Sequence, residues 1–161
     1  MILGCDRIRR LMVMQLDYTK LRPRLIKRKG LEVRHEFDIR QLDRLRDWLA
    51  CDEGTLKVEC QFIWPEEGNV LMDLSIQGPL AFTCQRCLEP FDFDWSSQTR
   101  LELDEQDSFL DDASDEQYEK ISLSYDGSFN LLDVITDEIM LGAPERHPDG
   151  CPDNLIARKI D

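Results

Sequence analysis

Four residues could together bind one metal ion, although they lie in two distant parts of the chain. Cys84 and Cys87 form a C-x-x-C pair, and His147 and Cys151 form an H-x-x-x-C pair. Each spacing lets two side chains reach the same ion, and three thiolates with one imidazole are a donor set of tetrahedral structural zinc. Such a site leaves no position open for a catalytic water. The sequence therefore predicts a structural zinc site, with reduced thiols in a turn as the alternative.

The C-x-x-C pair also raises the hypothesis of thiol redox chemistry, because Arg86 between the two cysteines could lower a thiol pKa. A thioredoxin-like pair lies between a strand and a helix. Here Pro90 and an alternating strand pattern follow the pair, which favours zinc over redox chemistry. The sequence contains no Walker loop, no G-x-G-x-x-G and no nucleophile elbow. We therefore expect that the protein is not an enzyme.

Length and composition are those of a single domain. At 161 residues the chain can bury a core without disulfides. It contains no run of about 20 apolar residues, and its first residues have no apolar region of signal-peptide length, so no membrane contact is predicted. In a reducing compartment six cysteines are free thiols or metal ligands. We expect a bacterial cytoplasm or the stroma of a plastid.

Charge divides the chain into a basic beginning and an acidic remainder. Residues 1–50 carry 13 Lys and Arg against 7 Asp and Glu, whereas residues 51–161 carry 7 against 26. Residues 1–30 are predicted to be a basic arm, with Met14 as a second candidate for the translation start. Nine acidic residues within 102–120 predict a solvated loop, with a docking segment for a cationic partner as the alternative.

The basic arm is the candidate RNA surface, because cationic side chains bind phosphates with release of counterions and the acidic remainder repels nucleic acid. Tyr18 could stack on a base. DNA is not an expected partner, and a merely solvated arm is the alternative. The cationic candidates are Lys20, Arg22, Arg24, Lys27, Arg28 and Lys29.

Hydrophobic periodicity predicts an α+β fold. Alternating apolar residues predict strands over 31–37, 56–62, 70–76, 80–83, 91–103 and 121–125. Helical spacing predicts one short helix over 38–50 and a second over 131–141, the second with Asn130 as its N-cap. We therefore expect residues 31–161 to form a single domain, an antiparallel sheet that could close into a barrel, with two short helices packed on it.

Two stretches resemble the YceD family, which is named for large ribosomal RNA subunit accumulation in bacteria and plastids. They are Phe-Thr-Cys-Gln-Arg-Cys-Leu-Glu-Pro-Phe at 82–91 and Asn-Leu-Leu-Asp-Val-Ile-Thr-Asp-Glu-Ile-Met-Leu at 130–141, followed by Pro144, His147 and Cys151. The resemblance covers about residues 31–152, and His147 stands where many relatives have Cys. It implies a role in synthesis, processing or stability of the large-subunit (23S) ribosomal RNA, and it implies no catalytic reaction.

Two functional hypotheses follow. The first is a non-enzymatic ribosome-biogenesis factor that binds pre-ribosomal RNA, or an assembly intermediate containing it, through the basic arm. The second is an acidic, chaperone-like adaptor that holds a basic ribosomal protein before assembly, because the acidic part of the chain suits a cationic protein.

Overall fold

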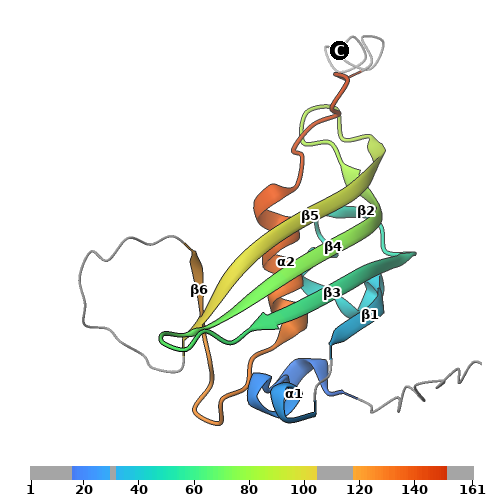
Figure 1. The fold of residues 1–161 in the computed structure, drawn as a ribbon. Helices are drawn as coiled ribbons and strands as arrows, with labels where there is room; N and C mark the ends of the chain where they lie inside the picture. Colours follow the sequence, from blue (N-terminus) through green and yellow to red (C-terminus); the bar gives the residue numbers. More distant parts are fainter. Residues whose placement is uncertain (1–15, 30–31, 105–117, 152–161) are drawn as a thin grey trace, which may run out of the picture.

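The computed structural model describes residues 16–29, 32–104 and 118–151, and its main feature is one six-stranded sheet (Figure 1). The strands are β1 (Val33–Asp38), β2 (Leu49–Cys51), β3 (Thr55–Ile63), β4 (Val70–Thr83), β5 (Pro90–Asp104) and β6 (Glu119–Ser122). Their order is β1-β3-β4-β5-β6, and β2 pairs with the far end of β4.

The sheet is mixed and open. Every described pair of strands is antiparallel except β5 with β6, which is parallel. A parallel pair needs a connection of about a dozen residues or more, and 14 residues separate the end of β5 from the start of β6 in the sequence. Strands β1 and β6 form the two edges and do not pair with each other. The α+β class is thus confirmed, whereas the structure does not support closure into a barrel, and the expectation of a wholly antiparallel sheet was wrong.

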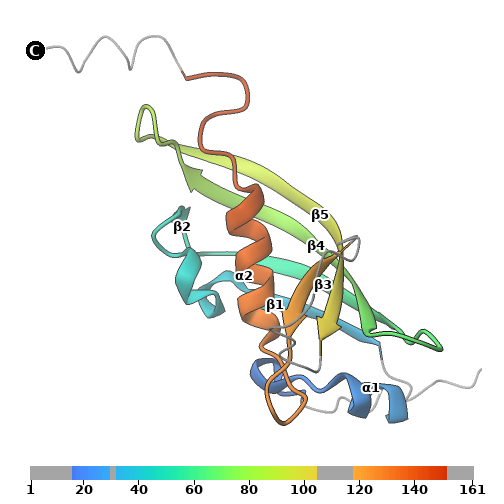
Figure 2. The same cartoon turned by 90° about the vertical axis from the view of Figure 1, so that its left-hand side faces the viewer.

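Helix α2 (Leu131–Gly142) covers one face of the sheet (Figure 2). The predicted N-cap is confirmed, because the Asn130 side chain accepts a hydrogen bond from the backbone N–H of Leu132. Alternate residues of the strands and one stripe of α2 meet in the core. Its central members include Leu56, Val58, Cys60, Met72, Leu74, Ile76, Leu131, Ile135 and Ile139.

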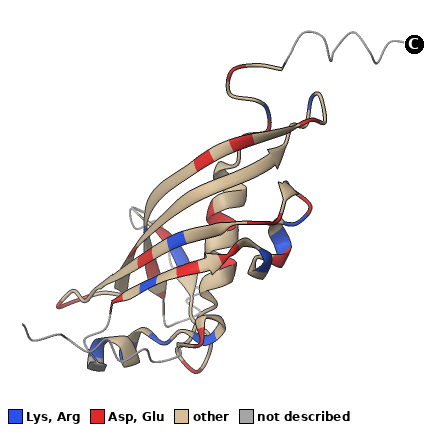
Figure 3. Cartoon of the chain, turned by 90° about the vertical axis from the view of Figure 1, so that its right-hand side faces the viewer, with Lys and Arg blue, Asp and Glu red and all other residues tan. Residues whose placement is uncertain are grey.

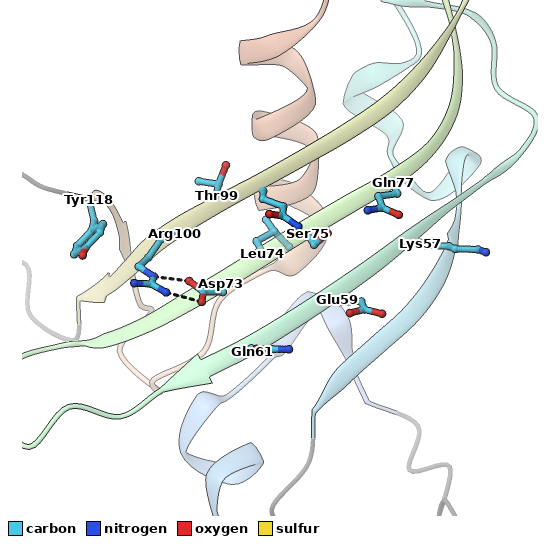
Figure 4. A pocket seen from close by; sticks show the side chains of 11 residues that line it. Lys57, Glu59, Gln61, Asp73, Leu74, Ser75, Gln77, Thr99, Arg100 and Tyr118 are labelled. Carbon is cyan, nitrogen blue, oxygen red and sulfur yellow. Dashed lines mark hydrogen bonds and ion pairs between the residues drawn. The ribbon is translucent and has the colours of Figure 1, made fainter.

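The opposite face of the sheet is polar and carries charges of both signs. Figure 4 shows Lys57 and Glu59 on β3, with Asp73 on β4 joined to Arg100 on β5 by two hydrogen bonds. The Arg100 guanidinium holds the pKa of the Asp73 carboxyl below its usual range. This face therefore has opposite charges paired across neighbouring strands, rather than a field of one sign.

The helix predicted over 38–50 is absent, and this prediction was wrong. Two short 3-10 turns, η2 (Ile39–Gln41) and η3 (Asp43–Leu45), are followed by strand β2. The buried residues Ile39, Leu42 and Leu45 recur every third position. This period fits a 3-10 helix, with 3.0 residues per turn, better than an α-helix. Pairing of β2 with β4 then prevents the chain from continuing as a helix.

Strand β4 runs without interruption through Gly78 and Pro79, where the sequence predicted an end. Pairing with β3 stops at Gln77, so the missing N–H of Pro79 removes no hydrogen bond to β3. Gly78 has φ +155°, and a Cβ atom there would lie 2.7 Å from the backbone oxygen of Thr55. Only glycine fits this close approach, so the strand can continue toward Thr83.

The basic segment (residues 16–29) contains the turn η1 (Tyr18–Lys20) and helix α1 (Pro23–Lys29). Leu21 and Phe129 exchange two backbone hydrogen bonds of 2.9 and 3.0 Å, and the side chains of Leu21 and Ile26 are buried. The domain boundary at residue 30 stays a prediction. Met14 and residues 105–117 of the acidic loop lie outside the described residues. Within the described ranges, each helix is too short or too polar to cross a bilayer.

Candidate metal centre

The turn between β4 and β5 carries the first two candidate ligands. Leu88 donates its backbone N–H to the carbonyl of Cys84 at 2.9 Å, and Cys84 donates to the carbonyl of Glu89 at 3.0 Å. Leu88 has φ +64°, a left-handed conformation that side-chain-bearing residues seldom adopt. These bonds reverse the chain tightly, so that Cys84 and Cys87 lie together at the end of the sheet.

The chain after α2 brings the other two candidates to the same place. The backbone N–H of Gln85 donates to the carbonyl of Glu145 at 2.8 Å, which joins the β4–β5 turn to the C-terminal segment. Gly150 donates to the carbonyl of His147 at 3.0 Å and closes a turn between His147 and Cys151. Figures 1 and 2 place both segments at the end of the molecule that lies away from α1.

The four donor atoms form a compact group, here called the Cys3His cluster (Cys84, Cys87, His147 and Cys151). The Sγ atoms of Cys84 and Cys151 are 3.6 Å apart, and the Sγ of Cys87 is 3.3 Å from Nε2 of His147. All four atoms lie within 4.8 Å of one another. A tetrahedron with Zn–S bonds of about 2.3 Å has edges of about 3.5–3.8 Å. The spacing of the predicted ligands is therefore compatible with a metal site.

Burial and hydrogen bonding set the thiol pKa values in the cluster. Burial of Cys84 opposes ionisation, but the backbone N–H groups of Cys87, Arg86 and His147, together with the Cys151 thiol, lower its pKa to about 6. Burial and the neighbouring sulfurs of Cys84 and Cys87 raise the pKa of Cys151 to about 11. Sulfur atoms this close cannot all ionise without a cation between them. The site can thus stabilise one thiolate by itself and needs a positive ion to hold three.

A low thiol pKa would also suit a nucleophilic cysteine, as the redox hypothesis requires. The side chain of Cys84, however, is 0 % exposed, and a reactive thiol must be reached by its substrate. The ring of His147 packs against Phe91 at 4.8 Å between centroids, which holds the imidazole toward Cys87. Four donors that converge in a closed position favour metal binding over thiol exchange.

The remaining described cysteines lie apart from the cluster. Cys60 is buried in the core, and burial raises the pKa of its thiol to about 12. Cys51 is exposed on β2. Among the described residues, the group that could hold a metal ion consists of the same four residues that the sequence predicted, and His35 instead stacks on Tyr18 at 4.7 Å between ring centroids.

The candidate RNA-binding residues gather at the opposite end, on the basic segment. Figure 3 shows Lys and Arg on this segment and also on the turns η2 and η3, with further Lys, Arg, Asp and Glu along the strands. Tyr18 is half-buried against His35 and Phe37, and burial raises the pKa of its hydroxyl. Lys27 lies 4.6 Å over the ring of Trp64.

The other cations of the basic segment differ in their surroundings. Arg22 forms an ion pair of 2.6 Å with Asp126, and Lys20 and Arg24 are exposed. The side chains of Arg28 and Lys29 lie outside the described part of the structure. One aromatic residue near this segment, Tyr125, is fully exposed and was missed, because a single Tyr in a polar turn carries no sequence signal.

The fold and the cluster define a small α+β protein whose sheet and last helix end at a shared four-donor site of metal-binding type. The family model described as "Large ribosomal RNA subunit accumulation protein YceD" matches residues 72–157, slightly more than half of the chain. The chain therefore belongs to the YceD family, and the match includes all four residues of the Cys3His cluster. Comparison with curated proteins and with solved structures gave no match.

Proposed function

We propose that the protein is a non-enzymatic ribosome-biogenesis factor that supports the accumulation of large-subunit (23S) ribosomal RNA by binding its precursor. The observation that carries this proposal is membership of the YceD family, whose name states that role. The protein would then act where ribosomes are assembled, in a bacterial cytoplasm or a plastid stroma.

The basic segment is the proposed RNA contact. It holds six Lys and Arg and one Asp in 14 residues, on a chain whose net charge is −13. Phosphates will approach this end and avoid the acidic remainder within the Debye length of about 8 Å. The buried side chains of Leu21 and Ile26 anchor the segment, so the exposed cations described on it lie on a folded surface; they are Lys20, Arg22, Arg24 and Lys27.

The proposed metal is a structural zinc ion held by the Cys3His cluster. Zinc would neutralise the thiolates and fasten the β4–β5 turn to the segment that follows α2. The four side chains already lie close together, so binding would require little rearrangement. In this proposal the metal stabilises the fold and takes no part in a reaction, since four protein ligands complete its tetrahedron.

Binding to a fragment of precursor RNA, measured over a series of salt concentrations, tests the RNA proposal. The double variant Lys20→Glu/Arg24→Glu should weaken binding and flatten the plot of log affinity against log salt by about 1.4, for two lost contacts to single-stranded RNA. The control is Lys57→Glu/Lys120→Glu, which makes the same change in charge elsewhere. Equal loss in both variants would show that net charge, and not the basic segment, governs binding.

A cellular test addresses the role itself. Deletion of the gene should lower mature 23S relative to 16S ribosomal RNA, and the wild-type gene should restore the ratio. The variant of the basic segment should fail to restore it, whereas the control variant should succeed. An unchanged 23S to 16S ratio in the deletion strain would contradict the proposal.

The acidic balance of residues 51–161 supports a second candidate, an adaptor for a basic ribosomal protein. Capture of partners at mild salt separates the two candidates. A ribosomal protein that stays bound after nuclease treatment supports the adaptor, whereas loss of all partners after nuclease treatment supports RNA binding.

A further inference from the structure

The turn between β6 and α2 presents a fully exposed aromatic ring. Tyr125 has a relative exposure of 109 %, the highest among the large hydrophobic and aromatic side chains of the described residues. Gly127 donates its backbone N–H to the carbonyl of Ser124 at 2.7 Å, which closes the turn that carries Tyr125. Nothing in the described core uses this ring, so its exposure needs another explanation than packing.

A hollow of about 340 Å³ lies beside the ring, and it joins the turn to the basic segment. We call it the Tyr125 hollow. Arg22 is held in it by its 2.6 Å ion pair with Asp126. Leu25 adds a partly exposed apolar surface. The residues that line the hollow are Arg22, Arg24, Leu25, Ser124, Tyr125, Asp126 and Gly127.

Backbone pairing fixes the two sides of the hollow relative to each other. Leu21 and Phe129 exchange two backbone hydrogen bonds. Leu21 directly precedes Arg22, and Phe129 follows the turn at 124–127 by two residues, so this bridge holds the arginine near the turn. Figures 1 and 2 both show α1 beside the chain that leads into α2. Tyr125 and the two arginines therefore line the same hollow in the folded protein, although about 100 residues separate them in sequence.

We propose that the Tyr125 hollow binds an unpaired base of single-stranded RNA, with the base stacked on Tyr125 and its phosphates near Arg22 and Arg24. This inference rests on the proposed function and names the form of RNA that is bound. An exposed aromatic ring beside planar guanidinium groups is the combination that binds splayed bases. A phosphate alone would need no ring, and an apolar peptide would gain nothing from two cationic side chains beside it.

The structure favours Tyr125 over Tyr18, the aromatic residue that the sequence suggested for stacking. The ring of Tyr18 already stacks on His35 at 4.7 Å and meets Phe37 edge-on at 4.8 Å. A base could reach it only if these contacts opened. Tyr125 can accept a base with no such rearrangement of the described residues.

Three RNA probes test the inference: a single strand of about 12 nucleotides without self-complementarity, its perfect duplex, and an abasic strand of the same length. Stacking of one base is worth about 1–3 kcal/mol, so Tyr125→Ala should weaken binding of the single strand about 5- to 150-fold. The salt slope should stay unchanged, because no charge is lost. Tyr125→Phe should retain wild-type affinity, and neither variant should affect the duplex or the abasic strand.

Tyr118→Ala is the matched control, because it removes the same type of ring from the polar face of the sheet. It should bind the single strand as the wild type does. Wild-type binding of single-stranded RNA that Tyr125→Ala leaves unchanged would overturn the inference and leave the RNA proposal standing. Failure of the wild type to bind any of the three probes would overturn both.

Discussion

The Sγ atom of Cys84 lies 3.6 Å from the Sγ atom of Cys151, although 67 positions separate the two residues in the chain. Cys84 lies in the turn that joins β4 to β5, the two longest strands of the sheet, and Cys151 follows the helix that covers that sheet. A metal ion at this point would close a loop that contains β5, β6 and α2. The cluster is therefore placed where one ion can stabilise most of the second half of the fold.

Loss of the metal should lower the free energy of unfolding by about 4 kcal/mol, the chain-entropy estimate for a crosslink that closes a loop of roughly 60 residues. We expect one equivalent of zinc in the purified protein. The Cys84→Ser variant should bind no zinc and should lack the contribution of the metal to the free energy of unfolding. Elemental analysis and thermal unfolding with and without a chelator measure both. Cys51→Ser, which removes an exposed thiol outside the cluster, should keep zinc and stability. Zinc-free wild-type protein with unchanged stability would contradict this prediction.

The four members of the Cys3His cluster could be selected from the sequence because few residue types bind zinc and their spacing restricts them further. C-x-x-C and H-x-x-x-C each define half of a tetrahedron locally, so only their meeting in space remained to be shown. The Tyr125 hollow could not be predicted in this way. It depends on the pairing of Leu21 with Phe129, and neither residue has a pattern that identifies its distant partner.

Among the elements, α2 was predictable because its cap and its apolar period agree. The stretch 38–50 was not, because apolar residues three apart fit both an α-helix and a series of 3-10 turns, and pairing with β4 decides between them. The continuation of β4 through Gly78 could not be predicted either, because it also depends on a contact between residues distant in the sequence. A Gly-Pro pair usually marks a turn, and only the contact with Thr55 shows that glycine serves close packing here.

Gly78→Ala should destabilise the protein strongly. Its Cβ would lie 2.7 Å from the backbone oxygen of Thr55 and 2.9 Å from Cδ2 of Leu56, at a φ that residues with side chains rarely adopt. Gly68→Ala is the matched control, because it has φ +93° but no atom within 4 Å of the new Cβ. We expect a loss of about 1–3 kcal/mol for Gly68→Ala, from backbone strain alone, and a larger loss for Gly78→Ala. Equal losses in urea unfolding would show that the close approach is unimportant.

Asn130→Ala should lower the stability of the protein by about 1 kcal/mol. The Asn130 side chain accepts the backbone N–H of Leu132 at 3.0 Å, and alanine would leave this donor at the start of α2 without a partner. Asn130→Ser supplies another oxygen acceptor and should restore most of the loss. Urea unfolding of the three proteins measures this. Because α2 leads to His147 and Cys151, the alanine variant should also release zinc to a chelator faster. Identical release rates in the wild type and the alanine variant would show that the cap does not affect the metal site.

The ion pair that shapes the Tyr125 hollow should be visible in the pH dependence of stability. Hydrogen bonds from Ser128 and from the Arg22 guanidinium lower the pKa of Asp126 to about 2, below the value of about 3.9 for an unfolded chain. The folded state therefore favours the ionised form, and this stabilisation is complete above about pH 5 and is lost as the pH falls from about 4 to 2. The melting temperature of the wild type should exceed that of Asp126→Asn near neutrality, and the difference should disappear toward pH 2. Protonation of the candidate metal ligands affects both proteins equally, so it cancels in the difference. A difference in melting temperature that is constant with pH for Asp126→Asn would mean that the charge of Asp126 does not hold Arg22 in place.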